Sequence, residues 1–289
     1  MDWTGATLLS ALALSLYDIG KKHSAAANKT FPTLLCTTAA AWAAAAAGTA
    51  AAGRMADVFA LDAAQYALLA AKSCIVASSW TFAYMALKTM PLTVMAPIRA
   101  TGPVWTLAGA MAIYGETPGA AQSAGFALSI AGCIAFSTAA RREGYALTAR
   151  PVVLAACATL AGSVSALFDK FLMGRAGIPP HAALFWFTAG MTAIYAAATA
   201  TAGRLDATRF SWRWTMPATG ALLAASDFFY FSAAAAPDAR ISVISVVRRS
   251  SVALTFLAGG AIFRESNLLR KGLALAAILA GVAVLCIAR

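Results

Sequence analysis

Residues 99–116, RATGPVWTLAGAMAIYGE, align without gaps with residues 248–265, RRSSVALTFLAGGAIFRE, when the chain is shifted against itself by 149 residues. The same shift places Lys21 on Lys170. Few residues of this chain are charged, so the coincidence of a Lys, an Arg and a Glu at one shift indicates an internal duplication.

The composition is that of a membrane protein. Hydrophobic residues make up 61% of the 289 residues and charged residues 11%, whereas a soluble domain has about 25% charged residues. These values exclude a water-soluble domain and an intrinsically disordered chain. The net charge is +11, but Lys and Arg lie in short loops or within apolar runs rather than in a basic patch with aromatic residues. We therefore expect a lipid bilayer as the partner, and no nucleic acid.

Turn residues divide the chain into ten apolar segments of about 20 residues, the length that crosses a bilayer as a helix. The predicted spans are 4–24, 31–52, 62–87, 92–114, 118–139, 152–174, 182–202, 215–236, 241–263 and 270–288. We expect an all-α integral membrane protein with ten transmembrane helices, arranged as a first five-helix repeat in residues 1–145 and a second in residues 146–289. Because five is odd, the second repeat is inverted, as in many secondary transporters with midplane sites.

Basic residues within or near the ends of these spans are candidates for a substrate site, because a charge at the centre of a span costs about 2.5–3.5 kcal/mol on insertion scales. They are Lys21, Arg99, Lys170, Arg248 and Arg249, with Lys72 as a weaker case. Arg99 and Arg248 occupy equivalent places in the two repeats. We interpret them as ligands of an anionic or zwitterionic small molecule, since guanidinium donates forked hydrogen bonds to carboxylate or phosphate. For Lys21 and Lys170, structural pairing with an acid is an equally good interpretation.

Acidic and aromatic residues complete the candidate site. The available counter-charges are Asp18, Asp169 and Asp227, and we expect Asp18 or Asp169 to carry a coupling proton, because a buried carboxylate can bind a proton near neutral pH. We expect up to half of the aromatic residues in the spans to line a cavity, with Trp80 and Tyr84 among the substrate-binding residues. The aromatic candidates are Trp80, Tyr84, Trp105, Phe168, Phe228 and Tyr230.

Other kinds of site lack the residues that they need. The five cysteines show no metal or redox spacing, so we predict neither a metal nor a cofactor. The two histidines, His23 and His181, are far apart, and the chain has no HExxH, GxSxG or paired catalytic carboxylates. A membrane-embedded enzyme is therefore an alternative that we do not favour. A second alternative is a flippase for a lipid-linked phosphate, in which the same arginines would bind the headgroup.

The two halves together resemble the EamA family of the drug/metabolite transporter superfamily. The resemblance lies in residues 91–136, which include IRATGP at 98–103 and YGE at 114–116, and in residues 241–287. It implies a ten-helix alternating-access transporter, multi-pass in the cell inner membrane and similar to exporters of amino acids and other metabolites. We expect a monomer and leave a dimer open.

Within that resemblance, IRATGP and VRRS at 247–250 also look like basic positions of the triose-phosphate translocator branch. This likeness implies that Arg99, Arg248 and Arg249 are anion ligands, although Arg99 stands where that branch has Lys. An organophosphate is therefore an expected substrate class beside an amino-acid-like molecule.

The distribution of Lys and Arg in the loops predicts the orientation. With ten spans, 13 of these residues fall on one side and four, Arg54, Arg175, Arg240 and Arg289, fall on the side of the termini. The positive-inside rule then places both termini outside the cytoplasm. A C-terminal reporter that is active only outside the cytoplasm should therefore be active, and a cytoplasmic C-terminus would contradict this orientation.

Overall fold

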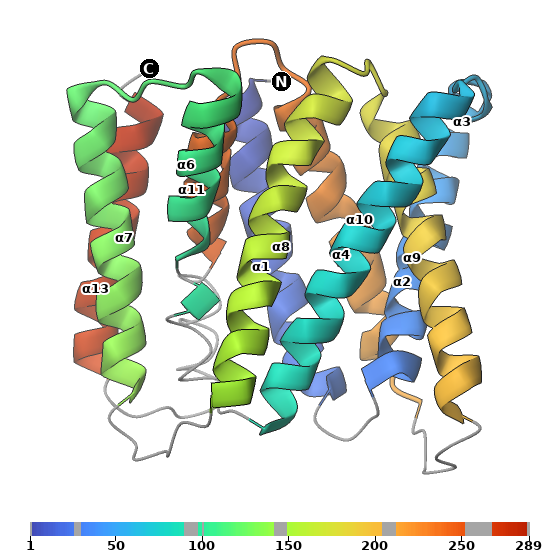
Figure 1. Cartoon of the computed structure of the whole chain (residues 1–289), viewed down its shortest axis with the longest axis horizontal. Helices are drawn as coiled ribbons and strands as arrows, with labels where there is room; N and C mark the ends of the chain where they lie inside the picture. Colours follow the sequence, from blue (N-terminus) through green and yellow to red (C-terminus); the bar gives the residue numbers. More distant parts are fainter. Residues whose placement is uncertain are drawn as a thin grey trace. The chain divides into compact units, whose positions relative to one another are not determined.

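A computed structural model describes residues 2–25, 30–89, 98–99, 101–141, 149–203, 212–251 and 268–287, and each regular element among them is an α-helix (Figure 1). The helices are α1 (Trp3–Ala25), α2 (Thr30–Ala51), α3 (Met55–Phe59), α4 (Ala63–Thr89), α6 (Gly102–Tyr114), α7 (Ala120–Arg141), α8 (Ala149–Gly174), α9 (Pro180–Gly203), α10 (Thr215–Ala234), α11 (Ile241–Arg249) and α13 (Leu268–Ile287).

The helices begin and end close to the predicted segments, because turn residues and caps set their boundaries. At the start of α4, for example, Asp62 Oδ1 accepts a hydrogen bond from the Gln65 backbone amide, and Gln65 Oε1 accepts one from the Asp62 amide, which forms a capping box. The short helix α3 was not predicted. Parts of the predicted spans 92–114 and 241–263 lie outside the described residues.

Among the residues that the structure describes, three helices are long and apolar enough to cross a membrane, judged by length and composition. They are Thr30–Ala51 in α2, Ala149–Gly174 in α8 and Pro180–Thr201 in α9, and the shorter segments Ala120–Ala135 and Gly272–Leu285 are also apolar. In lipid the backbone amides and carbonyls must bond within the protein, which a helix achieves in a single segment. The chain is therefore a helical membrane protein.

The chain forms two compact units, each built from two stretches of sequence. The first unit comprises Met1–Ala77 and Phe168–Pro237, and the second comprises Ser78–Leu167 and Asp238–Arg289. Each unit thus takes residues from both sequence halves. The division into repeats at 1–145 and 146–289 concerns sequence similarity and stays a prediction.

In the first unit, α1 packs along α10 and α2 packs along α9 (Figure 1). Ser10 and Ser226 exchange hydrogen bonds across the first pair, each hydroxyl donating to the other residue's carbonyl. Across the second pair, the rings of Phe31 and Tyr195 are in contact near one end, and those of Trp42 and Phe185 near the other. Residue numbers rise along α2 as they fall along α9, so these two helices are antiparallel.

In the second unit, α7 and α13 lie side by side (Figure 1). Gly125 faces Gly281, while Gly132 faces Ile278 and Ala274, so this pair is also antiparallel. A Cβ atom on Gly281 would lie 2.6 Å from the Gly125 carbonyl oxygen and 2.7 Å from the Ser129 amide nitrogen. Glycine is required here because the two backbones approach too closely for any side chain.

The shorter helices α6 and α11 of the second unit lie side by side and antiparallel, and Glu116 connects the end of α6 to the start of α11. Gly115, with φ of +64°, ends α6 in the left-handed conformation, which glycine adopts without strain. Glu116 then accepts hydrogen bonds from the backbone amides of Ile241 and Ser242 and from the Ser242 hydroxyl. The carboxylate satisfies the first amides of α11 and complements the positive end of its dipole.

The close approach of α7 and α13 leads to a test with a matched control on the same helix. Gly281→Ala should lower the free energy of unfolding by about 1–3 kcal/mol, because its methyl group collides with backbone atoms. Gly272→Ala should be neutral or stabilise the protein by up to about 1 kcal/mol, since a Cβ there meets nothing within 4 Å and alanine favours the helix. Thermal unfolding of the purified variants measures both effects, and equal melting temperatures would contradict the packing described.

Candidate functional site

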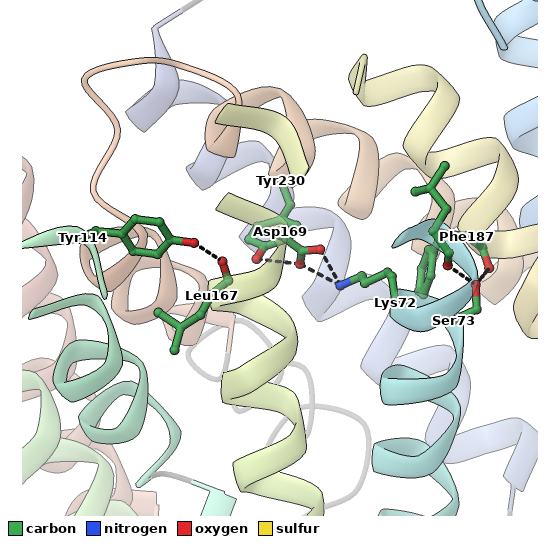
Figure 2. A network of polar contacts seen from close by, with 8 residues as sticks. Lys72, Ser73, Tyr114, Leu167, Asp169, Phe187 and Tyr230 are labelled. Carbon is green, nitrogen blue, oxygen red and sulfur yellow. Dashed lines mark hydrogen bonds and ion pairs between the residues drawn. The ribbon is translucent and has the colours of Figure 1, made fainter. Parts of the chain in front are cut away.

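The strongest candidate for a functional site among the described residues is a buried ion pair in the first unit. The ammonium nitrogen of Lys72, in α4, lies 2.6 Å from Asp169 Oδ1 and 2.7 Å from Oδ2, and donates a hydrogen bond to Oδ2 (Figure 2). Lys72 is 3% exposed, and Asp169, in α8, is 1% exposed. Removing two such charges from water costs several kcal/mol each, and a close pairing offsets that cost.

Three aromatic side chains surround this pair. Tyr230, in α10, donates a hydrogen bond to Asp169 Oδ2 over 3.0 Å (Figure 2). The Lys72 nitrogen lies 5.2 Å from the ring centre of Phe187 and 5.7 Å from that of Phe231, within the range of cation–π attraction. The ammonium therefore faces a carboxylate and two aromatic rings. We refer to Lys72, Asp169, Tyr230, Phe187 and Phe231 as the buried charge cluster.

The close packing of α4 against α9 fixes the base of the Lys72 side chain. The hydroxyl of Ser73, the next residue in α4, donates to the carbonyl of Leu69 at 2.9 Å and to the carbonyl of Phe187 in α9 at 3.3 Å (Figure 2). Gly190 permits this approach, since a Cβ there would lie 2.8 Å from Ser73 Cβ. Phe187 thus contributes its backbone to the helix contact and its ring to the buried charge cluster.

Two further charged residues belong to this region of the first unit. Asp227 lies in α10, three residues before Tyr230 and thus on the same helix face, and its carboxylate is within electrostatic range of Asp169. Lys170 follows Asp169 in α8, and its ammonium donates a hydrogen bond to the Ala236 carbonyl at 2.9 Å. Lys170 was expected to bind substrate or pair with an acid, and the structure shows its contact with this backbone carbonyl.

The candidate arginines lie in the second unit. Arg248 and Arg249 form the last turn of α11 and are partly buried, where the helix dipole favours positive charge. The Arg249 guanidinium lies against Gly102, the first residue of α6, so that a Cβ on Gly102 would be 2.9 Å from Nη2. Ser163, in α8, donates a hydrogen bond to the Gly102 carbonyl at 3.1 Å. Arg99 is exposed.

The structure brings Asp169 and Tyr230, both named from the sequence, into direct contact, and it pairs Asp169 with Lys72, the weaker candidate. Lys72 sits in the middle of the predicted span 62–87, and this position was the signal that marked it. Asp18 in α1 and Trp80 in α4 are partly buried, whereas Trp105 and Phe228 are exposed. The side chains of Lys21 and Tyr84 lie outside the described residues.

A second acid of the first unit has a very different environment. Asp57, in α3, has a side chain that is 40% exposed and forms an ion pair with Arg54, and Nε2 of His181 in α9 lies 3.4 Å from Asp57 Oδ2. The hydrogen bond donated by Arg54 holds the pKa of Asp57 below its usual value. Because Asp57 also contacts basic groups but is exposed to solvent, it is a matched control for Asp169.

Together these observations define a helical membrane protein with a buried charge cluster, and comparisons with known proteins show its fold. The sequence matches no family model and no curated protein. Among solved structures, 29 chains match. One crystal structure has a TM-score of 0.78 to this chain with 18% sequence identity, covering 98% of this chain and 97% of the other. The fold is therefore one that this solved structure also adopts over nearly its whole length.

The buried ion pair leads to a double-mutant test of stability. Lys72→Met leaves the Asp169 carboxylate buried without its ammonium, and should lower the free energy of unfolding by about 3–5 kcal/mol. Asp169→Asn should have a similar effect, because Lys72 then loses its carboxylate. The double variant should lose less than the sum of the two single variants, since it leaves no unpaired charge.

Lys170→Met is the matched control, because the same substitution one residue after Asp169 removes a hydrogen bond to a carbonyl and should cost about 1 kcal/mol. Thermal unfolding in one detergent measures all four variants. Strict additivity of the Lys72 and Asp169 effects would show that the two side chains do not interact.

Proposed function

We propose that this protein is a secondary-active transporter that moves a small anionic or zwitterionic metabolite, amino-acid-like or an organophosphate, across the cytoplasmic membrane by alternating access. The observation that carries the proposal is the buried charge cluster. Ionisable residues within membrane helices are costly, and they commonly mark substrate pathways or proton relays. Lys72 and Asp169 lie on helices of a membrane protein and are almost completely buried.

The contacts between helices support an inverted repeat. The 149-residue shift relates α2 to α9 and α7 to α13, and each of these pairs packs antiparallel within one unit. It also relates 99–116 to 248–265, the stretches to which α6 and the end of α11 belong. A helix that meets its own repeat partner in antiparallel fashion is expected where two inverted copies are related by a pseudo-twofold axis in the membrane plane. We therefore propose ten spans in the inner membrane and membership of the EamA-like transporters.

The charge of the candidate residues favours an anion as the substrate group. The three candidate charges of the second unit, Arg99, Arg248 and Arg249, are all basic. An excess of fixed cations suits a carboxylate or phosphate, because an anion completes the charge balance of a low-dielectric site. Asp18 and Asp169 are the candidates for carrying a coupling proton.

The proposal predicts ligand binding that depends on the arginines. A panel of amino acids and small organophosphates, added to the purified protein, should contain compounds that raise its melting temperature, because a ligand at 100 times its dissociation constant stabilises the folded state by about 2.7 kcal/mol. Arg248→Gln and Arg99→Gln should abolish this stabilisation and also transport into proteoliposomes, while both variants stay folded.

Arg54→Gln is the matched control, since Arg54 is an exposed arginine that pairs with Asp57 outside the predicted spans. Transport at the wild-type rate in both Arg99→Gln and Arg248→Gln would contradict the role given to these residues. A panel without any stabilising compound would count against a small anion or zwitterion as the substrate.

A further inference from the structure

Besides its carboxylate partner, two aromatic rings face the Lys72 ammonium, and a helix contact fixes the base of its side chain. Its helix is fixed against α9 by the Ser73 hydroxyl and by the close approach at Gly190. The rings of Phe187 and Phe231 face the ammonium at 5.2 and 5.7 Å from their centres. Because aromatic faces attract a cation without neutralising its charge, the ammonium would keep its place, and its need for an anion, if the Asp169 carboxylate withdrew.

Asp169 is the member of the pair that can exchange its charge for a proton. Its Oδ2 accepts hydrogen bonds from Lys72 and Tyr230. A carboxylate that loses its cationic partner becomes neutral by binding one proton. A protonated Asp169 keeps its contact with the Tyr230 hydroxyl, because a carboxyl group and a phenol can each donate or accept.

The ion pair also breaks the symmetry that the repeat would impose. The 149-residue shift places Asp169 on Gly20 and Lys72 on Ala221, so neither charge has a charged counterpart in the other half. An ion pair that served helix packing alone would be equally useful in both copies of a duplicated fold. The restriction of this pair to one copy indicates a task that the protein performs once, such as binding one substrate group.

We propose that Lys72 is the ligand of the substrate's anionic group, and that Asp169 is an internal anion that occupies the same position until the substrate displaces it. This inference rests on the proposed transport function and deepens it. When a carboxylate or phosphate binds the Lys72 ammonium, Asp169 takes one proton from the solvent onto a carboxyl oxygen. When the anion leaves, the proton returns to water and Asp169 pairs with Lys72 again. The site thus carries one ion pair in each state.

The charged and titratable groups around the cluster fit this exchange. Lys72 faces Asp169 from α4, and Asp227 and Tyr230 face it from α10, while Lys170 adjoins it in α8 and bonds to Ala236. On α9, His181 lies beside Asp57, and the Tyr195 hydroxyl donates to the Ala77 carbonyl. Among these groups of the described residues, Lys72 is the cation that contacts Asp169. An anion that takes the place of Asp169 would therefore bind at the Lys72 ammonium.

The test replaces the internal anion with a free one. Asp169→Ala removes the carboxylate and leaves space for formate, which carries the same charged group. In the purified full-length protein at constant ionic strength, formate should raise the melting temperature of Asp169→Ala above its value in chloride, by about 2–4 °C at ten times the dissociation constant. The wild type should shift less, because Asp169 already occupies the position.

Two controls separate a specific site from general salt effects. The double variant Lys72→Met/Asp169→Ala should show no formate-specific shift, since the cation is absent. Asp57→Ala, the same substitution at the exposed acid, should also show none. If Asp169→Ala does not fold, Asp169→Asn serves in its place, because the amide fills the same space without charge and formate should again stabilise it relative to chloride.

Absence of a formate-specific shift in both Asp169→Ala and Asp169→Asn would overturn the proposal, because a closed structural ion pair admits no anion from solution. A shift that persists in the Lys72→Met double variant would overturn it as well, since the anion would then bind elsewhere. These results leave the transport proposal separately testable, because that proposal depends on stabilisation of the wild type by metabolites and on Arg99 and Arg248. Failure of the anion-exchange proposal is thus distinguishable from failure of the transport proposal.

Discussion

The absence of water in the interior of a bilayer is the constraint on which this structure depends. It requires backbone amides and carbonyls to bond within the chain, and the described elements are accordingly helices. It also requires each charge within the membrane to find a partner in the protein, because lipid offers none. Lys72 and Asp169 meet this requirement from two helices that are far apart in sequence, and their pair connects α4 to α8.

Lipid gives helices no hydrophobic reason to associate, so contacts between them depend on shape and on hydrogen bonds. Glycine and serine provide both in this chain. Gly281 lets α13 touch the backbone of α7, Gly190 lets α9 touch Ser73, and Ser10 and Ser226 exchange hydrogen bonds between α1 and α10. The high alanine content of the spans follows from the same need, since small side chains allow close approach over the whole length of a helix.

Much of the secondary structure follows from local signals. Apolar length and turn residues placed the main helices, because both act within about 20 residues of sequence. The five-residue helix α3 was missed, since so short an element shows no periodic pattern. In the site, Asp169 and Tyr230 were named from their residue types within apolar spans. Lys72 was named as a weaker candidate, but its pairing with Asp169 was not predicted, because the two residues lie 97 positions apart. Lys72 also has no charged equivalent under the repeat, so no local pattern and no internal symmetry joins the two.

The contact between Glu116 and the start of α11 has a consequence for the order of synthesis. The carboxylate and the amide of Ile241 are separated by 125 residues, and a ribosome adds about 5–20 residues per second. Glu116 therefore emerges roughly 6–25 seconds before the helix end that it caps. During that interval its charge needs water or another donor, so the end of α6 can reach its final surroundings only after most of the chain has been made. The second unit is completed late, although one of its stretches is synthesised early.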